Sequence, residues 1–255
     1  MRVAIIGAGP SGLVTLKYLT TAHEFIPGLE PIQVKVFEAE GDIGGTFRYR
    51  TYEDAEVCYS RSRAAVPCGL SFFLLTILMP QLVSSKYLTC FSDFRPTPDE
   101  PQFMKATRYL QYLEDYVERF DLRQFIYLST RVVSVRRRDK GHVIRYNSPQ
   151  HGEEEWECDA VAVCSGLHVT PEIPKIPGME RVPSVLHSAQ FKGRKDFGND
   201  KTVVVLGVGE TAMDIAHMAV TTPATRRVVL CHKNGWVNAP KVFPRNDASN
   251  ATGIF

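Results

Sequence analysis

The stretch RVAIIGAGPSG, residues 2–12, decides the fold. It begins with a short run of apolar, partly β-branched residues, which is typical of a buried strand. The glycines that follow have the spacing G-x-G-x-x-G, and residues 10–20 then place apolar side chains at helical intervals. A second apolar run at 31–40 predicts another strand. A strand, a glycine turn, a helix and a strand in this order predict a βαβ unit.

Each glycine of this turn has its own expected role. Gly7 makes the tight turn out of the strand, Gly9 lets the backbone approach a pyrophosphate, and Gly12 lets the helix pack close to the strand. Pro10 and Ser11 lie at the start of the helix, where unpaired N–H groups and a partial positive charge attract an anion. The alternative is a structural turn of an α/β fold that binds no nucleotide.

Glu38 stands at the end of the second predicted strand. A carboxylate at this place can accept hydrogen bonds from both ribose hydroxyls of an adenosine. The alternative is an exposed acid at the end of a strand. Together with the glycine turn, Glu38 predicts a dinucleotide site.

A second turn of the same kind follows the apolar strand expected near residues 203–206. Gly207 and Gly209 repeat the first two glycines, alanine replaces the third, and Glu210 and Thr211 open the next helix. After the following strand the chain has a histidine and Lys233 instead of an acid. A cation there suits a 2′-phosphate and hence NADPH over NADH, although Lys233 could also be a solvated loop residue.

These two units predict an α/β fold with two dinucleotide-binding, Rossmann-like domains. A proline-rich loop separates them, so we expect an FAD-binding domain at 1–168 and an NADPH-binding domain at 169–255. Two dinucleotide sites in one chain favour a flavin held as FAD in the first and a nicotinamide that reduces it in the second. A long amphipathic helix is expected between them in sequence, at 99–120, with further strands at 125–138, 142–148 and 155–166.

Composition disfavours several other classes of protein. The 255 residues are 44% hydrophobic and 23% charged with a net charge of +2, which is ordinary for a globular protein. The basic run at 136–138 has no interleaved aromatics, so no nucleic-acid partner is expected. No C-x-x-C pair occurs among six cysteines, which disfavours a metal site and fits a cytoplasmic protein. The apolar run at 70–79 is shorter than the roughly 20 residues that span a bilayer.

Six motifs then occur in the order seen in flavin-containing monooxygenases, and the chain resembles the fungal, dimethylaniline-monooxygenase-like branch of that family. The motifs are GAGPSG, FEAEGDIGGTFRY (37–49), FSDFR (91–95), AVCSGLHVTPEIPKIPG (162–178), HSAQFK (187–192) and GVGETAMDIA (207–216).

The resemblance implies FAD and NADPH as cofactors and a small-molecule substrate that is a soft nucleophile, an amine nitrogen or a sulfide sulfur. In such enzymes NADPH reduces the FAD, oxygen adds as a flavin hydroperoxide, and the substrate takes the distal oxygen. No side chain need act as acid or base, so no catalytic residue is predicted. The resemblance adds Gly44, Gly45 and Thr46 beside the flavin, and Ser165 in the AVCSG motif, to the candidate cofactor contacts.

The chain also departs from the family pattern. Arg181 and Pro183 replace the F-x-G that precedes His187, a residue expected to link the two domains or to serve as an ordinary hydrogen-bonding residue there. The family's asparagine over the flavin falls on Val83. A related family that oxygenates ketones has tryptophan in place of Phe191, so phenylalanine favours nitrogen or sulfur oxidation.

Residues 57–81 have no counterpart in the pattern, and we interpret them as a retained intron, with a genuine surface insertion as the alternative. The family continues well beyond Phe255, so the chain is expected to be truncated and its NADPH domain incomplete. Two other functions therefore stay open. One is a non-catalytic flavoprotein fragment, and the other is a two-dinucleotide disulfide reductase, which the missing C-x-x-C disfavours.

Overall fold

The computed structural model describes residues 1–49, 82–167, 171–233, 235, 242–243 and 252–253. Its contacts divide the chain into two compact units. The first unit contains Met1–Arg50, Cys90–Pro98 and Ala106–Val169, and the second contains Thr51–Thr89, Asp99–Lys105 and Thr170–Phe255. The expected division at 168/169 concerns which residues bind FAD and which bind NADPH, and it stays a prediction. The expected insertion at 57–81 lies outside the described residues.

A parallel sheet forms the centre of the first unit. Its order is β3-β2-β1-β7, and the strands are β1 (Arg2–Ile6), β2 (Gln33–Phe37), β3 (Ile126–Tyr127) and β7 (Ala160–Val163). The central strand β1 is buried at Val3, Ala4 and Ile5, as its apolar sequence predicts. The βαβ unit expected from the opening residues is confirmed.

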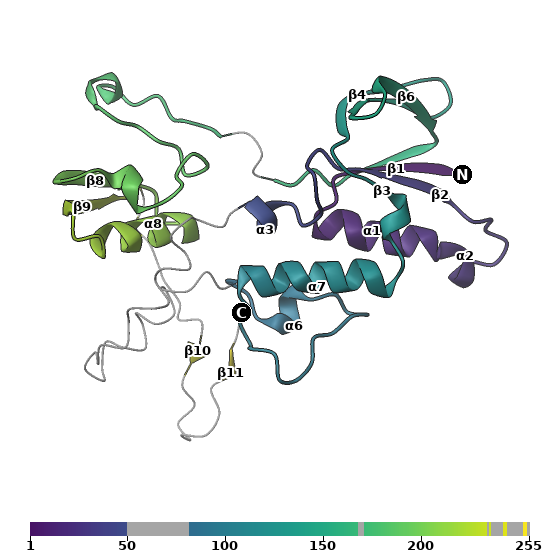
Figure 1. Cartoon of the computed structure of the whole chain (residues 1–255), viewed down its shortest axis with the longest axis horizontal. Helices are drawn as coiled ribbons and strands as arrows, with labels where there is room; N and C mark the ends of the chain where they lie inside the picture. Colours follow the sequence, from purple (N-terminus) through teal and green to yellow (C-terminus); the bar gives the residue numbers. More distant parts are fainter. Residues whose placement is uncertain (50–81, 168–170, 234, 236–241, 244–251, 254–255) are drawn as a thin grey trace. The chain divides into compact units, whose positions relative to one another are not determined.

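Helix α1 (Pro10–Thr20) covers one face of this sheet with Leu13 and Leu16, both fully buried (Figure 1). A short helix, α2 (Ala22–Phe25), follows it. An antiparallel sheet lies on the other face, formed by β4 (Arg131–Arg137), β5 (His142–Ser148) and β6 (Gly152–Cys158). Ala4 and Phe37 pack there against Ile144 and Tyr146. The first unit is therefore layered, with the parallel sheet between a helix and a second sheet.

The strands predicted at 125–138 and 155–166 each divide between the two sheets. The first becomes β3 and β4, separated by a turn in which Ser129 has φ 52°. The second becomes β6 and β7, separated by Asp159 alone, whose carboxylate accepts a hydrogen bond from the Arg2 backbone N–H at 2.6 Å. Apolar patterning locates the strands, but it does not say which sheet each one joins.

Helix α7 (Ala106–Arg119) begins later than the sequence predicts. Before it, the Gln102 carbonyl accepts a hydrogen bond from the Lys86 N–H, and the Met104 carbonyl accepts one from the Leu82 N–H. These carbonyls therefore do not bond within a helix. Short helices α3 (Thr46–Tyr49), α6 (Lys86–Thr89) and η1 (Arg123–Phe125) complete this part of the chain.

The buried face of α7 carries three tyrosines and two aliphatic residues: Tyr109, Tyr112, Leu113, Tyr116 and Val117. The Tyr112 hydroxyl donates to the Phe94 carbonyl and accepts from the Phe91 N–H, both at 2.7 Å. Burial raises the pKa of this tyrosine, so its hydroxyl stays protonated at every ordinary pH. These contacts fix the FSDFR motif against a rigid helix.

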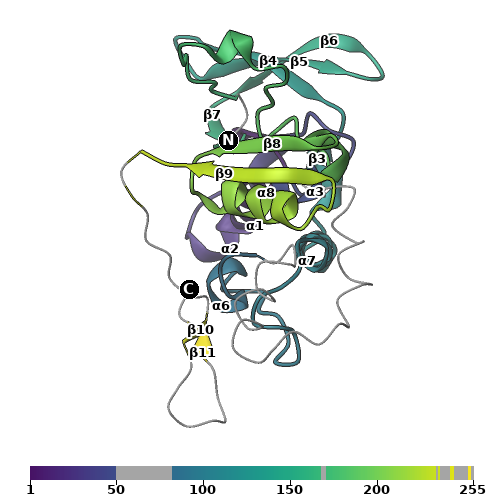
Figure 2. The ribbon, with the colours of Figure 1, turned by 90° about the vertical axis from the view of Figure 1, so that its left-hand side faces the viewer.

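In the second unit, strands β8 (Lys201–Leu206) and β9 (Thr225–Cys231) are parallel neighbours, and α8 (Glu210–Val220) connects and covers them (Figure 2). Phe191, Phe197 and Ala219 form its buried cluster. The remaining elements are η2 (Met179–Arg181), η3 (Arg194–Phe197), β10 (Val242–Phe243) and β11 (Thr252–Gly253). The second strand–turn–helix–strand unit is thus confirmed, and the fold is α/β.

None of the helices within the described residues is both long and apolar enough to cross a membrane. The apolar run at 70–79 lies outside those residues.

Candidate functional site

The first glycine turn lies at the carboxyl edge of the parallel sheet. The Gly7 N–H donates to the Phe37 carbonyl at 2.8 Å, which joins the turn to the end of β2. Helix α1 begins at Pro10, and no side chain caps its N-terminus. Its first turn also contains no acidic residue, so the positive end of the helix dipole is not neutralised locally. This end of α1, which includes Ser11, is suited to a phosphate.

Gly12 and Gly9 differ in what surrounds them. A Cβ on Gly12 would lie 1.9 Å from the Gly7 carbonyl oxygen, so helix and strand approach as closely as the motif requires. Among the described residues, a Cβ on Gly9 would meet no atom nearer than the Gly45 Cα, at 3.7 Å. The space at Gly9 is therefore not required for internal packing, as expected if a ligand approaches the backbone there.

Glu38 is buried at the end of β2, with 7% of its surface exposed. One carboxylate oxygen accepts the Ala8 N–H at 2.6 Å and the other accepts the Glu40 N–H at 2.9 Å. Each oxygen keeps a further lone pair for a ribose hydroxyl. The carboxylate thus also fixes the glycine turn, a role that the sequence alone does not predict.

A second loop lies against the glycine turn. The Gly44 N–H donates to the Ala8 carbonyl at 3.0 Å, and a Cβ on Gly45 would lie 3.2 Å from the Gly9 Cα. Thr46, the first residue of α3, is exposed. The structure therefore brings the two predicted flavin motifs together at the N-terminus of α1.

Ser165 follows β7 and is exposed at the same edge of the sheet. The preceding residue, Cys164, donates its N–H to the Ile6 carbonyl at 2.9 Å. Its carbonyl oxygen would lie 2.5 Å from a Cβ on Gly7. Residues from three strand ends, those of β1, β2 and β7, thus surround the glycine turn.

The second glycine turn has the same construction. The Gly207 N–H donates to the Cys231 carbonyl at 2.8 Å, and no atom of the part of the chain that the structure describes lies within 4 Å of a Cβ built on Gly209. No side chain caps α8, but Glu210 stands in its first turn and places a negative charge there. Thr211 follows it and is half-buried.

Lys233 is exposed just beyond the end of β9, at the edge of the sheet that carries this second turn. The neighbouring His232 accepts the Gly235 N–H through Nδ1 at 3.0 Å, which leaves its Nε2 as the proton-bearing nitrogen of the neutral ring. Lys233, the cation predicted to contact a 2′-phosphate, and its neighbour His232 therefore both stand at the carboxyl edge of β9.

Three other residues singled out in the sequence have different surroundings. His187 is half-buried and accepts the Ala189 N–H through Nδ1 at 3.2 Å, a local turn contact. Phe191 is 5% exposed and stacks obliquely on Phe197, with 5.0 Å between ring centroids. Its ring is a core residue of the second unit. Val83, in the position of the family's asparagine, is 50% exposed.

Four charged groups beside the first site, which form two ion pairs, were not predicted. Arg48 and Asp42 lie on the loop that carries Gly44. The sequence indicates their ion pair only in that the two residues have opposite charges and belong to the same motif. Lys17 of α1 lies 2.8 Å from Asp93 of the FSDFR motif. Burial acts to raise the pKa of Asp93, but the hydrogen bond and the charge of Lys17 outweigh it and the net shift is downward.

Metal ligation finds no support in the part of the chain that the structure describes, where no three His, Cys, Asp or Glu residues form a group that could hold an ion. The cysteines described there are in the reduced, thiol form: Cys90, Cys158, Cys164 and Cys231.

Two strand–turn–helix units, each with an uncapped helix N-terminus and open space at its second glycine, are the features of a protein with two dinucleotide sites. The chain matches the flavin-binding monooxygenase-like family model over residues 1–243, and it belongs to that family.

Two relatives illustrate the match. Monooxygenase cfoE of Aspergillus candidus is 53% identical over 250 residues, which cover 96% of this chain and 39% of that protein. The N-oxide-forming dimethylaniline monooxygenase 2 of Mus musculus is 34% identical over 244 residues, 92% of this chain and 41% of that protein. The chain thus spans about two fifths of the length of these relatives.

Solved structures agree with this fold. Tmm from Pelagibacter sp. strain HTCC7211 has a TM-score of 0.69 at 25% identity, over 90% of this chain and 50% of that one. The S-allyl-L-cysteine S-oxygenase of Allium sativum has a TM-score of 0.67 at 22% identity, over 98% of this chain and 54% of that one. The latter likeness concerns the fold alone.

Proposed function

We propose that this chain carries the FAD and NADPH sites of an oxygen-dependent flavoprotein monooxygenase. The observation that supports this best is the arrangement around Gly9, where the open backbone of the glycine turn, the Gly44–Gly45 loop and the Glu38 carboxylate meet at the uncapped end of α1. FAD contains a pyrophosphate, an adenosine ribose and a flavin, and each has a suitable partner among these groups.

In this proposal the domain predicted at residues 1–168 holds FAD. The N-terminus of α1 faces the pyrophosphate across Gly9, and Glu38 accepts the ribose hydroxyls. Gly44, Gly45 and Thr46 lie beside the flavin end, and Ser165 completes the edge. When bound, the flavin supplies the redox and oxygen chemistry, while these residues bind and orient it.

The domain predicted at residues 169–255 would bind NADPH. Gly207, Gly209, Glu210 and Thr211 form the turn over which the pyrophosphate lies, and Lys233 pairs with the 2′-phosphate. The negative charge of Glu210 opposes a phosphate at the end of α8, so binding here should be weaker than at the first site.

The substrate class we propose is a soft nucleophile, an amine or a sulfide. Support comes from the N-oxide-forming mouse relative, which is 34% identical. We assign no side chain as an acid or base. A second candidate is nucleotide binding without oxygen transfer, which the two glycine turns alone would support.

Purified full chain distinguishes these functions. The monooxygenase proposal expects yellow protein with about one FAD per chain, NADPH oxidation in air, and faster oxidation or an oxygenated product with a tertiary amine or a thioether. Bound FAD without NADPH oxidation would support the second candidate. Protein that binds neither cofactor, even when FAD is supplied in excess, would contradict both.

Lys233→Ala tests the choice of nicotinamide. We expect the Kd for NADPH to rise about tenfold, because only NADPH carries a 2′-phosphate for the ammonium to pair with. The Kd for NADH should barely change. Lys201→Ala is the matched control, since Lys201 is an exposed lysine at the opposite end of the same strand pair. Equal losses for both nucleotides in Lys233→Ala would show that Lys233 does not bind the 2′-phosphate.

A further inference from the structure

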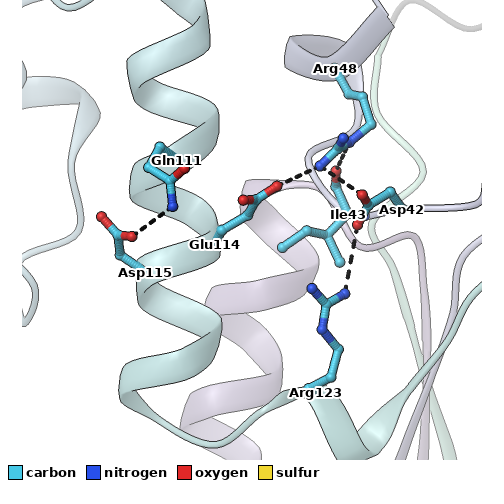
Figure 3. Close-up of polar contacts among 7 residues, drawn as sticks. All are labelled: Asp42, Ile43, Arg48, Gln111, Glu114, Asp115 and Arg123. Carbon is cyan, nitrogen blue, oxygen red and sulfur yellow. Dashed lines mark hydrogen bonds and ion pairs between the residues drawn. The ribbon is translucent and has the colours of Figure 1, made fainter.

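Arg48 joins three partners around the loop that carries Gly44 and Gly45 (Figure 3). Its Nε donates to the Ile43 carbonyl at 2.7 Å. Its Nη2 lies 2.7 Å from a carboxylate oxygen of Glu114 and 3.0 Å from one of Asp42. We call these contacts the Arg48 clamp. The guanidinium therefore connects the loop to helix α7, which bears Glu114.

The loop that the clamp holds has an unusual backbone. Gly44 and Gly45 have φ values of 114° and 55°, so two consecutive residues adopt conformations that few side chains tolerate. Two glycines in sequence also have many other conformations open to them in the absence of restraint. Only one hydrogen bond, from the Gly44 N–H to the Ala8 carbonyl, joins this glycine pair directly to the glycine turn within the described residues. The loop conformation therefore depends on what holds its flanks.

The clamp holds both flanks. Ile43 immediately precedes the two glycines, and Arg48 follows them at the end of a single helical turn, in which the Arg48 N–H donates to the Gly45 carbonyl at 3.1 Å. A Cβ on Gly44 would also lie 2.4 Å from Leu110 of α7. The loop is thus pressed against α7 at its glycine and tied to it at its charged residue.

Charge and burial make the clamp strong. Side-chain exposures are 23% for Arg48, 30% for Glu114 and 37% for Asp42, so the charges are only partly solvated. The other oxygen of Asp42 lies 3.6 Å from Arg123 and accepts the Ile43 N–H at 2.9 Å. Two cations and two anions therefore balance, and a planar guanidinium can bond several oxygens at once where an ammonium cannot.

We propose that Arg48 is a positioning residue that preorganises the FAD site. It holds the Gly44–Gly45 backbone next to Gly9, so that the two loops have the conformation for the cofactor before it arrives. Without the clamp, FAD binding would have to order the loop, and this cost would appear as lost affinity. Arg48 is not placed in contact with the reacting atoms. The inference rests on the FAD site proposed above.

The test measures the Kd for FAD by fluorescence titration of flavin-free full chain, together with the thermal unfolding of that flavin-free protein. Arg48→Ala should raise the Kd by about tenfold to a hundredfold, the usual effect of losing hydrogen bonds to charged groups. Arg48→Lys keeps the positive charge but loses the planar guanidinium, so its Kd should lie between those of the unaltered chain and Arg48→Ala. NADPH oxidation per bound flavin, measured at saturating FAD, should stay unchanged.

Gln111→Ala is the matched control. Gln111 lies on α7 one turn before Glu114, is exposed, and donates to Asp115 at 3.0 Å, away from the loop (Figure 3). It should leave the Kd unchanged. Glu114→Gln removes one charge of the clamp while Arg48 keeps its contacts to the loop, and should raise the Kd by about threefold to tenfold.

The outcomes separate the two proposals. An unaltered chain that binds no FAD overturns both. An unaltered chain that binds FAD, with Arg48→Ala within about threefold of it, overturns the clamp alone. Should Arg48→Ala fail to fold, Glu114→Gln decides, and an unchanged Kd in that variant overturns the clamp. Lost activity per bound flavin would also contradict a purely positioning role.

Discussion

Protein carrying Gly9→Val should fold and yet retain no flavin. A Cβ at Gly9 meets no atom closer than 3.7 Å within the described ranges, and the residue has an ordinary extended φ of −77°. The free energy of unfolding of the flavin-free protein should fall by only about 1 kcal/mol, the cost of an unfavourable N-cap residue. The added side chain would occupy the space that we assign to the pyrophosphate. Flavin absorbance per protein after gel filtration and urea unfolding of the flavin-free form measure the two effects.

Gly12→Val is the matched comparison, because its Cβ would lie 1.9 Å from the Gly7 carbonyl oxygen. Helix α1 must then move from the sheet, so the free energy of unfolding should fall by about 3 kcal/mol or more. Flavin should be lost here through loss of the fold. If Gly9→Val kept its flavin at unaltered occupancy, the assignment of this turn to FAD would be wrong.

Glu38→Ala should lose both stability and FAD affinity. It leaves the N–H groups of Ala8 and Glu40 without their carboxylate acceptor, and Ala8 is fully buried. An unsatisfied buried donor costs about 1–3 kcal/mol. The Kd for FAD should rise by about a hundredfold or more, since two hydrogen bonds from ribose to a charged acceptor are lost as well. Urea unfolding and FAD titration measure these losses.

Two further variants locate the cause. Glu38→Gln keeps one acceptor oxygen, so its loss of stability should be smaller while FAD affinity still falls. Glu40→Ala removes an acid two residues away whose exposed carboxylate lies 3.4 Å from Arg131. That exposed pair should contribute less than about 1 kcal/mol, and FAD affinity should stay unchanged. A loss of affinity in Glu40→Ala equal to that in Glu38→Ala would mean that general acidity, and not the buried carboxylate, matters.

Much of the fold could be predicted because its signals are local. The glycine spacing after a β-branched run fixes both strand–turn–helix units, and α1 and α8 occupy the residues expected. Sheet membership could not be predicted in this way. Strands β6 and β7 are adjacent in sequence but lie in different sheets, because each strand pairs with partners far away along the chain.

The residues of the candidate site also differ in whether local sequence could predict them. Gly7, Gly9, Gly12 and Glu38 were identifiable because the motif states what each residue does locally. The Arg48 clamp was not, since Glu114 lies 66 residues away and helical patterning marks it only as a polar position of α7. Phe191 was interpreted as a sign of substrate class, but its ring is packed in the core of the second unit, where sequence comparison cannot distinguish packing from selectivity.

The position of β7 in the first sheet has a consequence for synthesis on the ribosome. β1 is made first, yet one of its two neighbours, β7, begins at Ala160, and Asp159 bonds Arg2 across 157 residues. At about 5–20 residues per second, β1 waits on the order of ten seconds for β7 after β2 has emerged. During this interval one edge of β1 is unpaired and Gly7 lacks the backbone of Cys164 beside it. A nascent chain therefore cannot complete the surroundings of Gly7 early, and its buried central strand is exposed to other chains until the segment near residue 165 leaves the tunnel.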